Sequence, residues 1–169
     1  MLSVLIETRN DEENLPPTLA SLISGLVEGA VREVIVCDRD STDGTGRVAE
    51  HAGCTFLASG GIAAGIRQAK SEWLLMIEPG ARLVDGWTEA VLAHAMRHQM
   101  PAQFSRSKIG RAPFLSRVFS KNRALANGLL ISRVRALALS KGGGDAEAIA
   151  RGLATRRLTS EIRVAAARR

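Results

Sequence analysis

Long hydrophobic runs are missing from this sequence of 169 residues. The first apolar run, residues 2–6, ends at Glu7 and has neither a basic lead nor a cleavage site, so we expect neither a signal peptide nor a membrane span. Cysteine is scarce as well, and Cys37 and Cys54 each lie within or beside an apolar stretch. This pattern excludes a disulfide framework and predicts two buried thiols in a reducing, cytoplasmic compartment.

Acidic residues are absent from residues 90–144, which hold 10 lysines and arginines. Residues 1–89 hold 7 basic and 14 acidic side chains, so the formal net charge of +6 arises in one region of the chain. We expect that region to form an electropositive surface facing an anionic partner such as lipid headgroups or diphosphates. Aromatic residues make up only 4% and no known nucleic-acid-binding module is present, so nucleic acid is not the partner that the sequence indicates.

Residues 104–123 combine aromatic and cationic side chains. Phe104, Phe114 and Phe119 are interspersed with basic residues, namely Arg106, Lys108, Arg111, Arg117 and Lys121. Such a composition suits shallow insertion beside anionic lipid, where each near-surface cation contributes about 1 kcal/mol. The segment therefore predicts a peripheral contact with an anionic membrane surface, and a solvated basic face is the alternative.

The overall composition is that of one globular domain. Hydrophobic residues make up 46% of the chain, enough for a single core over residues 1–169. Apolar runs and helical patterns alternate, which predicts strands at 2–6, 34–37, 55–58 and 73–77 and helices at 15–26, 45–52 and 61–70. Later patterns predict helices at 87–98 and 145–153, and either a strand or a buried helix at 125–131. The alternation indicates an α/β fold with a parallel sheet.

Ligands of such sheets bind beyond the carboxyl ends of the strands. The segments that follow the predicted strands are residues 8–10, 38–44, 59–61 and 78–80. Asp38 ends its strand, where a carboxylate can accept hydrogen bonds from a base N–H or a ribose hydroxyl. Asp43 precedes a helix whose free N–H groups it can satisfy. A G-x-G-x-x-A pattern at residues 44–49 is separated from Cys37 by six residues, too far from the strand for a dinucleotide-binding turn.

Three stretches in order resemble the strand blocks of family-2 glycosyltransferases: VLIETRNDEENLPPTLASL, EVIVCDRDSTDGT and AGIRQAKSEWLLMIEPGARL. The match over residues 41–45, Ser-Thr-Asp-Gly-Thr, is the most specific. The resemblance implies a Rossmann-like GT-A fold with a mostly parallel central sheet and helices on both faces. It also implies a nucleotide-sugar-binding half at residues 1–89 and a basic, acceptor-side half at residues 90–169.

The resemblance also implies roles for individual residues. The nucleotide-sugar would lie against residues at two strand ends, namely Thr8, Arg9, Asn10, Asp38, Arg39 and Asp40, with Asp38 at the base. A carboxylate base near a late helix start would take the acceptor proton, and the candidates are Asp145 and Glu147. Asp145 as a helix N-cap is the alternative for that residue.

The element that departs from the family is D-x-D, which appears here as residues 78–80, Glu-Pro-Gly. The motif implies a divalent cation, Mg²⁺ or Mn²⁺, that offsets charge on the departing diphosphate. Glu78 keeps one carboxylate as the candidate metal ligand, whereas Gly80 has no side chain. Arg9 or Arg39 is a candidate to neutralise the diphosphate instead, and a solvated arginine is the alternative.

These features together predict a glycosyltransferase that moves a sugar from a nucleotide-diphosphate sugar to an acceptor. A lipid-linked acceptor at the inner face of the membrane is the candidate that the basic segment suggests. The alternative is a catalytically degenerate GT-A-like module for binding or regulation, which Gly80 favours.

Overall fold

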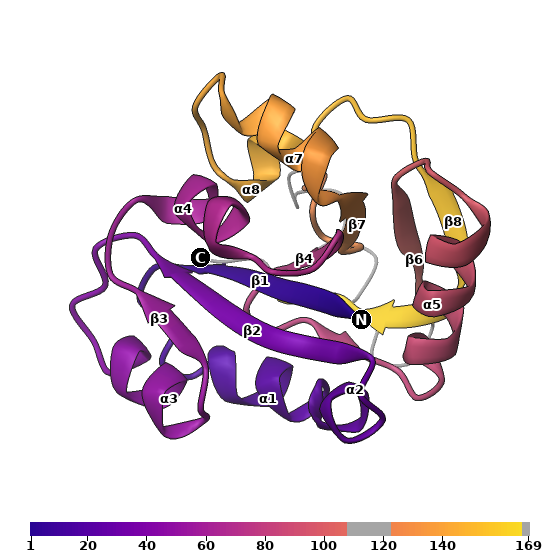
Figure 1. Cartoon of the computed structure of the whole chain (residues 1–169). Coiled ribbons are helices and arrows are strands. Elements are labelled where there is room, and N and C mark those ends of the chain that lie inside the picture. Colours follow the sequence, from indigo (N-terminus) through magenta and orange to yellow (C-terminus); the bar gives the residue numbers. More distant parts are fainter. Residues whose placement is uncertain (108–122, 167–169) are drawn as a thin grey trace, which may run out of the picture.

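The computed structural model describes residues 1–107 and 123–166, which form one mixed eight-stranded sheet with helices on both faces (Figure 1). The strand order is β3-β2-β1-β4-β7-β6-β8-β5. The strands are β1 (Leu2–Thr8), β2 (Val31–Asp38), β3 (Thr55–Leu57), β4 (Trp73–Ile77), β5 (Arg82–Leu83), β6 (Ala102–Arg106), β7 (Leu129–Ser132) and β8 (Arg156–Arg163). The helices are α1 (Leu15–Ala20), α2 (Ile23–Val27), α3 (Thr45–His51), α4 (Gly61–Gln68), α5 (Trp87–Arg97), α7 (Arg133–Ser140) and α8 (Ala146–Ala150).

The first four strands form the parallel part of the sheet. β1 pairs in parallel with β2 on one side and β4 on the other, so that Leu5 lies beside Ile35 and Met76. β3 extends this part beyond β2. Because parallel strands end at the same edge, Thr8 and Asp38 are adjacent in register. The segments that follow β1, β2 and β4 therefore meet at one edge, as predicted.

Alternating apolar side chains give the sheet two cores. Val4, Val36 and Leu75 belong to one core, which also contains apolar residues of α1, α3 and α5. Leu5 and Ile35 belong to the other core, which contains apolar residues of α4, α7 and α8. Figure 1 shows α1, α2 and α3 beneath the parallel strands and α4, α7 and α8 above them. The predicted α/β fold with helices on both faces is confirmed.

The second half of the chain adds elements that the patterns did not predict. β7 runs antiparallel to β4, which resolves the ambiguity over residues 125–131 in favour of a strand. β5, β6, β8 and α7 were not predicted. β5 has only two residues, and β6 and β8 have too few apolar residues to give a clear period. The predicted helix at 15–26 is in fact two short helices. Between them the Ser21 hydroxyl donates to the Thr18 carbonyl at 2.7 Å, and such local bonding competes with helix continuation.

Part of the predicted membrane-facing segment lies inside the core. Phe104 in β6 is only 1% exposed and packs in the same core as Leu75, so its proposed insertion into lipid is wrong. Arg106 donates from Nε to the Asn127 side chain at 2.7 Å. The rest of that segment, residues 108–122, lies outside the described residues. None of the described helices has the length and apolar character that crossing a bilayer requires.

Candidate functional site

The loops that follow β1 and β2 are joined by hydrogen bonds between backbone and side chains. The Asn10 N–H donates to Ser41 Oγ at 2.8 Å, and Asn10 Oδ1 accepts from the Thr42 N–H at 2.8 Å. Asp43 Oδ2 accepts from the Glu12 N–H at 3.1 Å, and its Oδ1 accepts from the first N–H of α3, at Thr45. Most polar side chains of the Ser-Thr-Asp-Gly-Thr stretch thus hold the loops in shape.

Asp43 supports the start of α3, as its position predicts. Burial acts to raise the pKa of Asp43, but hydrogen bonds from Thr45 and from the Glu12 N–H outweigh it and hold the pKa below its usual value. Asp43 is therefore a carboxylate that stabilises the loop and the start of α3.

Asp38 lies at the carboxyl end of β2 and is 5% exposed. Its Oδ1 accepts from Thr8 Oγ1 at 2.8 Å and from Ser41 Oγ at 2.6 Å, and its Oδ2 accepts from the Ser41 N–H at 2.8 Å. Each carboxylate oxygen has two lone pairs, so Oδ1 is saturated while Oδ2 keeps capacity for one more donor. The carboxylate is thus held in a fixed orientation that can accept a further hydrogen bond.

The other predicted nucleotide-contacting residues form an exposed rim around Asp38 and Thr8: Arg9, Asn10, Arg39 and Asp40. Asn10 and Asp40 have φ angles of 55° and 56°, in the left-handed region that Asn and Asp tolerate better than most residues. The structure brings all six predicted residues to one edge of the sheet. Backbone strain is confined to the two residues at the tips of the loops.

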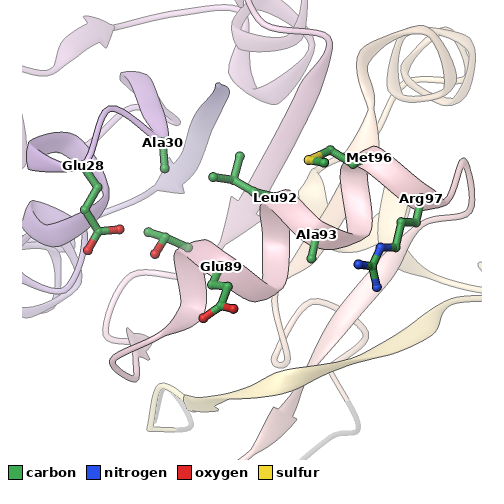
Figure 2. Close-up of a pocket in the computed structure, with 8 residues that line it drawn as sticks. Glu28, Ala30, Glu89, Leu92, Ala93, Met96 and Arg97 are labelled. Atoms are coloured by element: carbon green, nitrogen blue, oxygen red, sulfur yellow. The ribbon is translucent and has the colours of Figure 1, made fainter.

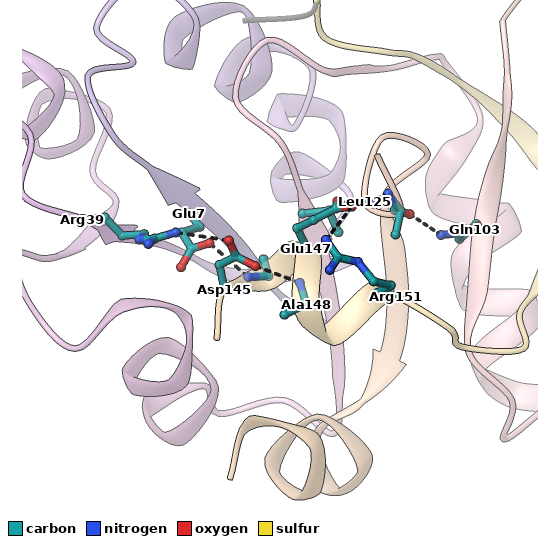
Figure 3. A network of polar contacts seen from close by, with 10 residues as sticks. Glu7, Arg39, Gln103, Leu125, Asp145, Glu147, Ala148 and Arg151 are labelled. Carbon is teal, nitrogen blue, oxygen red and sulfur yellow. Dashed lines mark hydrogen bonds and ion pairs between the residues drawn. The ribbon is translucent and has the colours of Figure 1, made fainter. Parts of the chain in front are cut away.

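Opposite this rim lies the start of α8 (Figure 3). Asp145 caps that helix, since its Oδ1 accepts from the Ala148 N–H at 2.8 Å, and its Oδ2 lies 3.3 Å from Arg39 Nη1. The N-cap alternative is therefore observed together with an ion pair between Asp145 and Arg39. Glu7 completes the group, because its Oε2 accepts from the Ala146 N–H at 3.0 Å.

Glu7 was not among the predicted site residues. Burial raises its pKa, against the opposing effects of the Ala146 N–H and the Arg39 guanidinium. No local pattern marks Glu7, because its contact with the Ala146 N–H joins segments that are 139 positions apart in the chain. Glu7 joins the end of β1 to the start of α8 and so positions Asp145 relative to the strand ends.

Glu147, the other candidate base, is bound to the backbone instead (Figure 3). Its Oε1 accepts from the Ala124 N–H at 2.6 Å and its Oε2 from the Leu125 N–H at 2.9 Å. Both oxygens are thus occupied by the segment that leads into β7. Asp145 is the one of the two candidates that faces Arg39.

A separate hollow of about 430 Å³ lies between the end of α2 and α5 (Figure 2). Its lining is mostly apolar and includes Ala30, Leu92 and Met96 beside Glu28, Glu89 and Arg97. Ala30 immediately precedes β2, so this hollow lies at the amino ends of the strands. It contains none of the predicted site residues and lies at the opposite end of β2 from Asp38.

The sequence model for glycosyl transferase family 2 matches residues 3–125. The chain belongs to glycosyl transferase family 2. The matched region contains β1 to β4 and both loops around Asp38. No curated protein matches this family-2 chain in sequence.

Solved structures resemble this family-2 chain in fold. Staphylococcus aureus TarS 1–349 shares 19% identity at a TM-score of 0.62, covering 93% of this chain and 57% of that chain. Mycobacterium tuberculosis glucosyl-3-phosphoglycerate synthase, GpgS, with Mn²⁺, UDP and glucosyl-3-phosphoglycerate, shares 15% identity at a TM-score of 0.61, covering 100% and 72%. Rubrobacter xylanophilus mannosyl-3-phosphoglycerate synthase shares 17% identity at a TM-score of 0.58, covering 80% and 54%. This chain thus spans a little over half the length of TarS 1–349, and the likeness confirms the predicted GT-A fold.

The predicted cation site at Glu78 has a different composition from the one expected in this family. Glu78 Oε2 lies 3.0 Å from Arg123 Nη1, so an arginine already faces the candidate metal ligand. Among the described residues, no group of three or more His, Cys, Asp and Glu side chains is placed to hold a metal ion. Mg²⁺ and Mn²⁺ favour several oxygen ligands, and the Arg123 guanidinium beside the Glu78 carboxylate repels them. The residues present at Glu78 therefore do not fit the predicted divalent cation.

Proposed function

We propose that this family-2 chain moves a sugar from a nucleotide-diphosphate sugar to an acceptor hydroxyl, at the sheet edge beyond β1, β2 and β4. The observation that carries the proposal is Asp38, a buried and oriented carboxylate whose Oδ2 has capacity for one more donor. A nucleobase N–H or a ribose hydroxyl is such a donor. Residues 1–89 would hold the nucleotide-sugar, and residues 90–169 would face the acceptor.

UDP is the first nucleotide to test, since TarS has been solved with UDP and with UDP-GlcNAc, and GpgS with UDP. Thr8 and Asp38 would form the floor for the nucleotide. Arg9, Asn10, Arg39 and Asp40 would form the rim that the diphosphate and sugar pass.

Asp145 is the base in this proposal. As the acceptor oxygen forms its bond to the anomeric carbon, its proton passes to the Asp145 carboxylate. The bond from that carbon to the diphosphate oxygen breaks, and the electron pair leaves with the diphosphate. Arg39, 3.3 Å from Asp145 Oδ2, and the Ala148 N–H on Oδ1 hold the carboxylate in one orientation. Glu147 is left out of the chemistry because its carboxylate is bound to the backbone before β7, whereas Asp145 is paired with Arg39, one of the predicted nucleotide-contacting residues.

Calorimetric titration with UDP and GDP tests the binding part of this proposal. Asp38→Asn should lower the affinity for the preferred nucleotide by about 10-fold or more, since a hydrogen bond to a charged group contributes about 1.5–3 kcal/mol. Asp85→Asn is the matched control, because Asp85 is exposed and lines a different groove. Equal affinities for Asp38→Asn and the wild type would show that Asp38 does not contact the nucleotide.

Turnover distinguishes the transferase from the second candidate, a binding or regulatory module. Gly80 and the Glu78–Arg123 ion pair favour the module, because both depart from the D-x-D pattern. The assay measures nucleotide release from UDP-sugars and GDP-sugars, with and without added acceptor alcohols. Release that Asp145→Asn abolishes while nucleotide affinity is kept supports the transferase. Binding without release in the wild type supports the module.

We further propose that the acceptor is lipid-linked and lies at the inner face of the membrane. It is supported by the 10 basic and no acidic residues between residues 90 and 144. Sedimentation with vesicles of anionic lipid at low salt, compared with neutral vesicles, tests it. Equal sedimentation with both kinds of vesicle would remove the support for a membrane-bound acceptor.

A further inference from the structure

The end of β4 carries a partly buried ion pair that joins three distant segments. Glu78 and Arg123 lie 3.0 Å apart, and their side chains are 15% and 27% exposed. Arg123 Nη2 also donates to the Ala165 carbonyl at 2.7 Å. The guanidinium is therefore held between the end of β4 and the segment after β8, and it keeps part of its surface accessible.

The backbone at Gly80 leaves little room for a second carboxylate at this place. Its φ is +89°, and its N–H donates to the Asn14 carbonyl at 2.9 Å and to Thr18 Oγ1 at 2.8 Å. A Cβ at this position would lie 3.2 Å from the Cβ of Ala165. A side chain here would thus be strained by the left-handed φ and crowded by the segment whose carbonyl holds Arg123.

We propose that Arg123 supplies, from the protein itself, the positive charge that faces the nucleotide diphosphate, so that nucleotide binding needs no divalent cation. This inference rests on the proposed function. A guanidinium has five N–H groups, and the contacts described above use one on each Nη atom. The remaining N–H groups can donate to diphosphate oxygens, and planar donor pairs match phosphate geometry.

Glu78 has a distinct role in this arrangement. Its carboxylate orients the Arg123 guanidinium in the free protein, and it competes with an incoming diphosphate for the same donors. Removing the charge of Glu78 should therefore leave diphosphate binding unchanged or strengthen it. A metal ligand would behave in the opposite way, because its loss would weaken binding that depends on the cation.

The experiment is calorimetric titration of the full chain with UDP, uridine, GDP and guanosine, in EDTA and then in Mn²⁺. We expect the affinity for the preferred diphosphate to agree within about 2-fold between the two conditions. Arg123→Met should lower that affinity at least 10-fold and leave the affinity for the matching nucleoside unchanged. Glu78→Gln should give wild-type or higher diphosphate affinity in EDTA. Arg97→Met is the matched control, since Arg97 is exposed and lines the hollow at the other edge of the sheet.

Three results would overturn the proposal. The first is a diphosphate affinity of the wild type that rises 10-fold or more with Mn²⁺, together with no such rise for the Glu78→Gln variant. The second is an Arg123→Met variant with wild-type diphosphate affinity. In both cases the nucleotide site itself stands, because nucleoside and diphosphate still bind. The third is no binding of any of the four ligands in either condition, which overturns the proposed function and this inference together.

Discussion

Removal of the Glu147 carboxylate should destabilise the fold strongly, although its position in the sequence made this residue a candidate for the catalytic base. Its two oxygens accept from the Ala124 and Leu125 N–H groups at 2.6 and 2.9 Å, and its side chain is 26% exposed. Glu147→Ala leaves both donors without this partner. Since each poorly satisfied donor costs about 1–3 kcal/mol, we expect a loss of about 2–4 kcal/mol with partial rehydration. At about 2–4 °C per kcal/mol for a chain of this size, the melting temperature should fall by about 4–16 °C.

The assay is thermal unfolding followed by circular dichroism, with three comparison variants. Glu147→Gln keeps one acceptor oxygen and should lose about half as much stability. Asp145→Asn keeps an N-cap side chain and loses only an exposed ion pair, so it should cost less than about 1 kcal/mol. Glu50→Ala is the control for removing an exposed helical glutamate. If Glu147→Ala lowers the stability by no more than Asp145→Asn does, the conclusion that Glu147 stabilises the fold is refuted.

Other predictions test the strand-end cluster and the core beside it. Burial raises the folded-state pKa of Glu7 above its usual value of 4.5. The protonated side chain therefore contributes stability below pH 4.5, and this contribution is lost as the pH rises through the folded-state pKa. Glu7→Gln should remove this part of the pH dependence of stability. Urea unfolding at pH 4 and pH 8 measures this, and an unchanged difference between the two pH values would contradict it. Gly65→Ala places a Cβ against Cys37 Sγ and should lower the free energy of unfolding by about 1–3 kcal/mol. A second substitution, Cys37→Ala, should restore part of this loss. Strictly additive effects of the two substitutions would argue against the contact. Asp40→Ala should be less stable than Asp40→Gly by about 1 kcal/mol, because φ is +56° there, and equal stabilities would contradict it.

Local patterns predicted the first half of the molecule well, for a physical reason. Three of the parallel strands, β1, β2 and β4, are buried on both faces over most of their length, so each contains a short continuous apolar run that contrasts with the helices between them. The boundaries were less accurate. β2 begins at Val31, three residues before the predicted start, because its first residues include the polar Arg32 and Glu33.

The second half was predicted poorly because its strands are held by partners instead of by their own pattern. β8 has buried residues only at Leu158 and Ile162 among its eight, and it owes its conformation to pairing with β6 and β5. Phe104 was predicted to face lipid because it is an aromatic residue close to basic residues in the sequence. Its burial depends on the packing of β6 within the sheet, which no local pattern contains.

The sequence by itself determined the α/β alternation, the family, and the gathering of Thr8, Asp38 and the Ser-Thr-Asp-Gly-Thr loop at one sheet edge. These follow from the period of apolar residues and from loop chemistry, both of which act over a few neighbouring residues. Only the tertiary structure decided how the later carboxylates are used. Asp145 is paired with Arg39, Glu147 binds the backbone before β7, and Glu78 is paired with Arg123. The partners in each of these contacts lie far apart in the chain or on segments without regular pattern, so only folding brings them within reach of one another.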